Sequence, residues 1–232
     1  MLSVRNLEVY HGDVRSLKDV SFDISPGEVL CLLGRNGAGK TTSLRAIMGL
    51  APVRSGSVVF DGVELTSLPP HAIPKTGIGY VPQGRRLFAE MTVRENLEIG
   101  LMARNTDRAI LDSIFSLFPV LKSRLQQVSG TLSGGEQQML AMARALCLDP
   151  ALILMDEPTE GLMPSMIATI RDVILELRAR GKAVLLVEQR MEAVLSVADR
   201  VCFVENGETK ATMATDVLRV DPDLVKAYVG IV

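Results

Sequence analysis

GRNGAGKT, residues 34–41, decides the fold, because it has the spacing G-x-x-x-x-G-K-T of a loop that binds phosphate groups. Its glycines allow a tight turn in which backbone N–H groups converge on phosphate oxygens. Lys40 places a cation beside the phosphates, and the Thr41 hydroxyl is a natural ligand for Mg²⁺. An ordinary glycine turn would not need Lys and Thr at this offset. We predict that a nucleoside triphosphate binds here through Gly34, Arg35, Asn36, Gly37, Ala38, Gly39, Lys40, Thr41 and Thr42.

The segments on either side of this loop fit the same role. The apolar run VLCLL, residues 29–33, predicts a buried strand, and residues 41–50 predict a helix. The N-terminus of such a helix carries a partial positive charge that faces the phosphates. A strand, a phosphate-binding loop and a helix are therefore expected to follow one another.

Composition limits the classes of protein that this chain can be. It has 232 residues, 47% of them hydrophobic, and a formal net charge of −2 that gives no electrostatic basis for nucleic-acid binding. The three cysteines are isolated in apolar stretches, which predicts neither a disulfide framework nor a metal site and indicates a reducing compartment. We find no signal peptide and no apolar run of about 18 residues, so we expect a soluble protein whose membrane role requires a partner.

The order of patterns along the chain predicts an α/β fold. Before residue 87, short alternating segments and turns indicate antiparallel strands around the strand–loop–helix unit. From residue 87 to about residue 149, apolar residues recur at helical spacing. The continuous apolar runs 151–156 and 183–187 are typical of strands that are buried on both faces of a parallel sheet.

Polar side chains follow these predicted strands directly. Asp156 and Glu157 end one apolar run, Gln83 ends the strand predicted for residues 77–83, and Gln189 follows another run. Functional groups of open α/β sheets collect at such carboxyl ends. The alternative for the two carboxylates is a solvated strand end, and for Gln83 it is an exposed loop position.

LSGGEQQ, residues 132–138, marks the start of a second helix. Ser133 and Glu136 have the spacing of a capping box, which needs no function. A capping box does not explain Gly134 and Gly135, since each glycine in a helix costs up to about 1 kcal/mol relative to alanine. Paired glycines leave N–H groups accessible to an anion that approaches closely. Because the chain already has a phosphate loop, we predict that Ser133, Gly134 and Gly135 serve a nucleotide on another subunit.

These motifs together resemble the ATPase subunits of ABC transporters over essentially the whole chain. The resemblance implies a P-loop NTPase (RecA-like) core with an N-terminal antiparallel β-subdomain and an inserted α-helical subdomain. It divides the single ABC ATPase domain, residues 1–232, into a core with the β-subdomain, residues 1–86 and 150–232, and a helical subdomain with the signature motif, residues 87–149. Two such subunits sandwich two ATP molecules, each between one subunit's phosphate loop and the other's signature motif.

The resemblance also implies roles for individual residues. Thr41, Gln83 and Asp156 would hold Mg²⁺, and Glu157 would polarise the attacking water with help from Gln83. Most members have a histidine where this chain has Gln189, which puts the catalytic competence of this subunit's own site in doubt. An aromatic residue usually stacks on adenine just before a glycine of the first hairpin. Here His11 stands directly before Gly12 and Tyr10 precedes it, and both rings are candidates for stacking on adenine.

Three segments narrow the resemblance further. VPQGRRLFAEMTVRENLEIG (81–100), PTEGLMPS (158–165) and LLVEQR (185–190) resemble the shorter ATPase of branched-chain amino acid importers. That subunit pairs with a second, non-identical ATPase. ATPases of urea and short-chain amide importers have similar stretches. A chromosome or repair ATPase would carry long coiled-coil arms, and a translation-type ABC protein would normally carry two cassettes.

An importer of this kind implies a particular setting. The ATPase would lie peripherally on the cytoplasmic face of the bacterial inner membrane and bind permease subunits there. An extracytoplasmic binding protein would be an indirect partner. Residues 83–88 would line the groove that receives a permease helix, with Leu87 and Phe88 as apolar anchors; the alternative is that both belong to the subdomain core.

Overall fold

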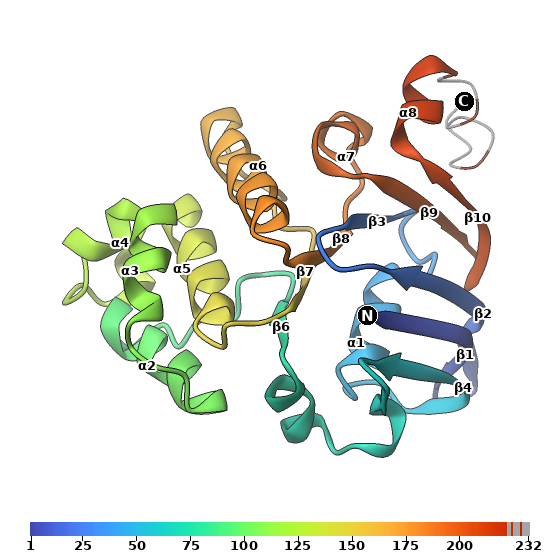
Figure 1. Cartoon of the computed structure of the whole chain (residues 1–232), viewed down its shortest axis with the longest axis horizontal. Helices are drawn as coiled ribbons and strands as arrows, with labels where there is room; N and C mark the ends of the chain where they lie inside the picture. The colour runs from blue at the N-terminus through green and yellow to red at the C-terminus, as the bar shows by residue number, and fades with distance from the viewer. Residues whose placement is uncertain (222–223, 225–227, 229–232) are drawn as a thin grey trace.

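A computed structural model describes residues 1–221, 224 and 228 of the chain (Figure 1). The strands are β1 (Leu2–His11), β2 (Val14–Ile24), β3 (Val29–Leu33), β4 (Val53–Phe60), β5 (Val63–Glu64), β6 (Ile78–Val81), β7 (Leu152–Asp156), β8 (Ala183–Val187), β9 (Arg200–Glu205) and β10 (Glu208–Ala214). The α-helices are α1 (Lys40–Ile47), α2 (Val93–Arg104), α3 (Ile110–Leu117), α4 (Pro119–Ser123), α5 (Gly134–Leu146), α6 (Pro164–Ala179), α7 (Met191–Val197) and α8 (Thr215–Val220). Short 3₁₀ turns cover Leu65–Ser67, Pro70–Thr76 and Ser129–Thr131.

These strands form one sheet in the order β5-β4-β1-β2-β10-β9-β3-β8-β7-β6. One half is antiparallel, because β1 pairs with both β2 and β4, and β4 pairs with β5. The other half is parallel from β9 through β3, β8 and β7 to β6. The predicted change from hairpins to parallel strands is therefore confirmed. β10 joins the halves, since it pairs antiparallel with β9 and parallel with β2.

The parallel strands are buried on both faces, as their continuous apolar runs predict. Val29, Cys31 and Leu33 of β3 join a core cluster with apolar residues of α5, α6 and α7. Leu30 and Leu32, which alternate with them, join a second cluster with residues of α1, β1 and β2. Because successive side chains of a strand point to opposite faces, β3 contributes residues to both core clusters. The three cysteines are buried and unpaired, in agreement with the sequence.

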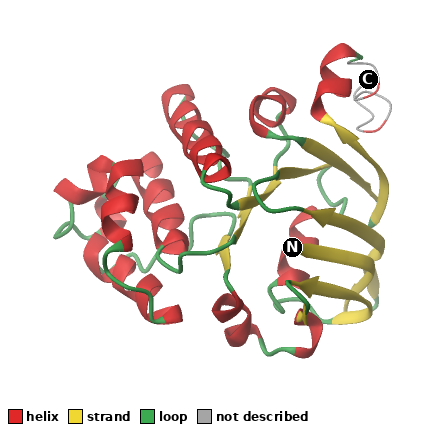
Figure 2. Ribbon diagram, in the orientation of Figure 1, coloured by secondary structure: helices red, strands yellow, loops and turns green. Residues whose placement is uncertain are grey.

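Helices α2 to α5 lie to one side of the sheet, beyond β6 (Figures 1 and 2). The chain leaves β6, forms the helices that the spacing of apolar residues predicts, and returns through β7. This is the inserted helical part that the resemblance implies. Asn96 of α2 is fully buried there, and its side-chain amide bonds the backbone of Phe88 through both of its polar atoms. This amide fixes the chain where it enters the helical part.

Two further turns follow from local sequence. Asn206 and Gly207 join β9 to β10 with φ angles of 51° and 79°, the left-handed conformation that the Asn-Gly pair predicts for a hairpin. Gly181 follows the end of α6 with a φ of 78°, in agreement with its expected position after the helix. The turn at Gly181 returns the chain to the parallel half of the sheet through β8, and the turn at Asn206 and Gly207 leads into β10, which joins the two halves.

Candidate nucleotide site

A cavity of about 680 Å³ lies where β3, β6, β7 and β8 end. Its walls include the predicted phosphate loop, together with Gln83 after β6, Glu157 after β7 and Gln189 after β8. The phosphate-loop and α1 residues in its lining are Asn36, Gly37, Gly39, Lys40, Thr41 and Thr42. Residues that are more than 100 positions apart in the sequence therefore meet at one edge of the sheet.

The phosphate loop requires glycine for steric reasons. A Cβ atom at Gly34 would lie 2.0 Å from the carbonyl oxygen of Val204. Gly39 has a φ of 110°, and a Cβ there would lie 2.5 Å from Cδ2 of Leu17. No side chain fits either position while the loop stays against β2 and β9.

Lys40 is held at the centre of this loop. Its side chain is 4% exposed, and Nζ donates hydrogen bonds to the carbonyl oxygens of Gly34 at 2.7 Å and Arg35 at 2.9 Å. Burial lowers the pKa of Lys40, whereas the nearby carboxylates of Glu157 and Asp156 act to raise it. The loop thus holds the Lys40 cation against its own carbonyl oxygens, within the lining of the cavity.

Thr41 joins the phosphate loop to β7. Its hydroxyl donates a 3.0 Å hydrogen bond to Oδ1 of Asp156, whose side chain is 1% exposed. Oδ2 of Asp156 is buried and finds no hydrogen-bond partner among the described residues. Burial raises the pKa of Asp156, since a buried carboxylate lacks solvation. A hydroxyl and an unsatisfied carboxylate oxygen are the donor set that a hard cation such as Mg²⁺ prefers.

Glu157 is surrounded by amide groups. Gln189 donates a 2.6 Å hydrogen bond from Nε2 to Oε1, and Gln83 donates a longer one of 3.4 Å to Oε2. The backbone of Glu157 has a φ of 48°, and its N–H bonds the carbonyl of Val187 at 2.9 Å. Gln83 also donates a 2.9 Å bond to Glu160, a cavity residue that the sequence analysis did not select. Its only sequence signal is its place in PTEGL, three residues after Glu157.

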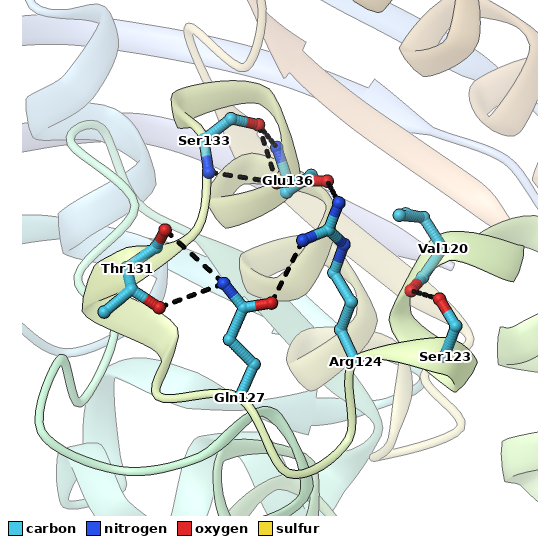
Figure 3. A network of polar contacts seen from close by, with 7 residues as sticks. All are labelled: Val120, Ser123, Arg124, Gln127, Thr131, Ser133 and Glu136. Atoms are coloured by element: carbon cyan, nitrogen blue, oxygen red, sulfur yellow. Dashed lines mark hydrogen bonds and ion pairs between the residues drawn. The ribbon is translucent and has the colours of Figure 1, made fainter.

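The predicted capping box at the start of α5 is confirmed. Ser133 accepts a hydrogen bond from the backbone of Glu136, whose carboxylate accepts from the backbone and hydroxyl of Ser133 (Figure 3). Arg124 forms a 2.9 Å ion pair with Glu136, and its other nitrogen donates to Gln127. Burial acts to raise the pKa of Glu136, but the bonds from Ser133 and the charge of Arg124 hold it below its usual value. Gln127 in turn donates to Thr131, so this network fixes the turn that precedes the helix.

The two glycines of α5 face side chains of the same chain. A Cβ at Gly134 would lie 3.0 Å from Nη2 of Arg85, and one at Gly135 would lie 2.7 Å from Cε of Met166. Close packing within the chain is thus a second reason for glycine, one that the sequence does not reveal. Ser133, Gly134 and Gly135 lie outside the lining of the nucleotide cavity, so the chain does not bring its own signature motif to its own phosphate loop.

The loop after β6 has an unusual backbone. Gly84, Arg85 and Arg86 follow one another with φ angles of 77°, 65° and 47°. Two contacts from α5 hold this conformation: Arg85 donates a 3.0 Å bond to Gln137, and Arg144 donates a 2.7 Å bond to the carbonyl of Arg86. This loop connects Gln83 directly to the helical part of the chain.

The cavity is not lined by the aromatic residues that the sequence predicts to stack on adenine. Tyr10 bonds Glu8, and His11 bonds Ser16, but neither aromatic residue lines the cavity. Val14, which follows them at the start of β2, does line it and is 68% exposed. A single aliphatic residue at the start of a strand carries no sequence signal for ligand binding. Stacking by Tyr10 or His11 on adenine stays a prediction.

Comparison with known proteins places this site in a family. The family model described as "ABC transporter" matches residues 17–160. The chain therefore belongs to the ABC transporter family, and it is an ATPase of the ATP-binding cassette type. In the part of the chain that the structure describes, no helix is long and apolar enough to cross a membrane.

Its similarity to particular relatives extends over the full length. It is 42% identical to BraG of Pseudomonas aeruginosa, a high-affinity branched-chain amino acid transport ATP-binding protein, over 99% of this chain and 100% of that one. It is 38% identical to a probable LivF of Archaeoglobus fulgidus, with 100% of each chain covered. Identity to the lipopolysaccharide export protein LptB of Haemophilus influenzae is 34%, over 99% and 97%.

Solved structures agree with this assignment. A nucleotide-free ATP-binding cassette of an ABC transporter superposes with a TM-score of 0.85 at 29% identity, over 100% of this chain and 99% of that chain. A dimeric cassette in a post-hydrolysis state, bound to ADP and Pi, gives 0.84 at 26% identity, over 93% and 99%. The predicted P-loop NTPase fold of an ABC ATPase is confirmed.

Substitutions at Glu157 and Lys40 are expected to separate hydrolysis from binding. Glu157→Gln keeps the size of the side chain but removes the charge that is expected to act on water, so hydrolysis by the assembled transporter falls about 10²–10⁴-fold while nucleotide still binds. Lys40→Ala removes the cation and abolishes binding. Equilibrium binding of a fluorescent ATP analogue and phosphate release measure the two effects. Wild-type hydrolysis by Glu157→Gln would contradict the role of this carboxylate.

Proposed function

We propose that this chain is the ATP-hydrolysing motor subunit of an importer for branched-chain amino acids, and that it acts on a separate membrane permease. The observation that carries the proposal is the meeting of Lys40, Glu157 and Gln189 at one cavity, with Gln189 bonded to Glu157. Thr41, which also lines the cavity, bonds the buried Asp156 behind it. The similarity to BraG and LivF supports the substrate class. In this role the chain lies peripherally on the cytoplasmic face of the bacterial inner membrane, and an extracytoplasmic binding protein delivers the substrate to the permease.

The residues of the cavity have distinct chemical tasks in hydrolysis. Lys40 and the loop N–H groups bind the phosphates of ATP. Thr41, Asp156 and Gln83 would hold Mg²⁺, which would neutralise charge on the phosphates. Glu157 accepts a hydrogen bond from the attacking water and orients it, and Gln189 holds Glu157 in place through the 2.6 Å bond.

The position of the signature motif supports a two-subunit arrangement. Ser133, Gly134 and Gly135 lie outside the cavity that contains Lys40. The N-terminus of α5 suits an anion, because helix N–H groups there lack partners within the helix. We infer that these residues cover the ATP of a second, non-identical ATPase, whose own signature motif covers the ATP on Lys40.

The surface beside α5 supports contact with a permease. Leu87 packs against the core, which favours the alternative for that residue. Phe88 is 48% exposed, and the Arg144 guanidinium lies 5.3 Å from the centre of its ring. An exposed aromatic ring beside an arginine has the composition of an interface anchor.

A photocrosslinker at position 88 is therefore expected to capture the permease in membranes that contain the assembled transporter. A matched crosslinker at Met102, which is 79% exposed on α2, serves as the surface control. Immunoblotting for the permease gives the readout. Equal capture from both positions, or none from position 88, would contradict the role of Phe88.

Uptake measurements test the proposed substrate. In cells that lack this chain, uptake of labelled leucine, isoleucine and valine is expected to fall, and the wild-type chain but not Lys40→Ala restores it. Urea and acetamide uptake, measured in the same cells, stay unchanged. Loss of urea or acetamide uptake instead would show that the chain serves a related importer with that substrate. Co-purification with ribosomes or DNA in place of a permease would contradict a role in transport.

The two composite sites of the transporter are expected to be unequal. Gln189 donates an amide hydrogen bond but carries no charge and cannot shuttle a proton as histidine does. If the partner ATPase carries histidine, its site performs most of the hydrolysis, and this chain's signature motif completes that site. Glu157→Gln here then lowers steady-state ATPase of the reconstituted transporter less than the equivalent change in the partner.

A bulky residue at Gly135 should lower the steady-state ATPase activity of the transporter nearly as much as substitution of the partner's catalytic carboxylate does. Because Gly135 also contacts Met166, Gly135→Leu is tested together with Met166→Ala, which removes the obstruction within the chain. Met166→Ala alone is the control. The asymmetry is refuted if Glu157→Gln proves more damaging than the substitution of the partner's carboxylate.

A further inference from the structure

Glu188 is a buried carboxylate that lies outside the nucleotide cavity. It is the last residue before Gln189, and its side chain is 3% exposed. Neither Glu188 nor its partner Thr159 lines the nucleotide cavity. Both line a separate cavity of about 320 Å³ between α6 and α7. Glu188 therefore does not touch the nucleotide from this position.

The carboxylate of Glu188 accepts hydrogen bonds from two different loops. Thr159, 6% exposed in the loop after β7, donates from its hydroxyl at 2.6 Å and from its backbone N–H at 3.2 Å, both to Oε1. The backbone N–H of Gln189 donates to Oε2 at 3.3 Å. Burial raises the pKa of Glu188 above its usual value, and these donors offset only part of that effect. The carboxylate thus joins the loop after β7 to the end of β8.

These two segments carry the pair of side chains that meet in the nucleotide cavity. Thr159 is two residues after Glu157, and Glu188 is one residue before Gln189. The Glu157 N–H also bonds Val187, the last residue of β8. The distance between Glu157 and Gln189 therefore depends on how the segment after β7 is held against the end of β8.

We propose that Glu188 is a positioning residue for ATP hydrolysis: by holding Thr159, it fixes Glu157 and Gln189 in the relative position that orients the attacking water. Burial of a charged group is costly unless its hydrogen bonds are complete. The hydrogen bonds of Glu188 to Thr159 and Gln189 therefore favour one geometry of the two segments over others. This inference rests on the proposed role of Glu157.

Substitutions that keep size but remove one hydrogen bond test the link. Glu188→Gln replaces one acceptor oxygen with a donor NH₂ group, which then faces the donor of Thr159 or of Gln189. Thr159→Val removes the hydroxyl and keeps the branched shape, whereas Thr159→Ser keeps the hydroxyl. Glu192→Gln is the matched control, because Glu192 is exposed on α7 and lines the same cavity.

In the assembled transporter, Glu188→Gln and Thr159→Val are each expected to lower kcat about ten- to a hundredfold, since a small misplacement of a catalytic group has an effect of this size. KM for MgATP stays within about twofold, because neither residue touches the nucleotide cavity. Thr159→Ser and Glu192→Gln retain kcat. Added to Glu157→Gln, Glu188→Gln causes no further loss of kcat, because it acts through Glu157.

Thermal unfolding of each variant separates this role from a purely structural one. A lowered Tm with unchanged kcat in Glu188→Gln and Thr159→Val would overturn the inference, and so would a full additional loss of kcat in the Glu157→Gln background. Wild-type kcat in Glu157→Gln itself would instead refute the proposed function on which the inference rests. The two failures are thus distinguished by the Glu157 variant alone.

Discussion

Every residue of β3, β7 and β8 is at most 1% exposed, because helices or other strands cover both faces of this part of the sheet. A polar side chain inside these strands would lose its solvation and find few partners. Charged and amide groups therefore follow the strands, where the chain emerges at one edge. That restriction brings Lys40, Glu157 and Gln189 together, and it explains why the site needs residues from distant parts of the sequence.

Within this edge, β7 is connected to both of the segments to which we assign roles in hydrolysis. Asp156, the last residue of β7, accepts a hydrogen bond from the hydroxyl of Thr41. Thr159, just after β7, donates a hydrogen bond from its hydroxyl to Glu188, which follows β8. Both connections use a threonine hydroxyl and a carboxylate that is at least 97% buried. Little water competes for these bonds, so each defines a single geometry.

The sequence predicts those features that depend on local pattern. The phosphate loop, the capping box of Ser133 and Glu136, and the parallel strands all follow from spacing or periodicity. Features set by tertiary contacts could not be predicted in the same way. The contact of Met166 with Gly135 and the hydrogen bond from Thr159 to Glu188 join residues that are distant in the sequence, so no local pattern predicts them. The lining by Val14 was missed for the same reason, since only the folded hairpin brings it to the cavity.

The left-handed backbone at Arg85 and Arg86 has an energetic consequence for movement of the chain. Residues with a Cβ cost about 1 kcal/mol or more each in this conformation, so the loop holds energy that its contacts with α5 must offset. Moving α5 away breaks the bonds of Gln137 and Arg144 to this loop and allows both arginines to relax to ordinary φ angles. Relaxation returns part of the energy that breaking those bonds requires. Separating α5 from this loop thus costs less than its two hydrogen bonds alone would require, at the point of the chain that directly follows Gln83 of the nucleotide cavity.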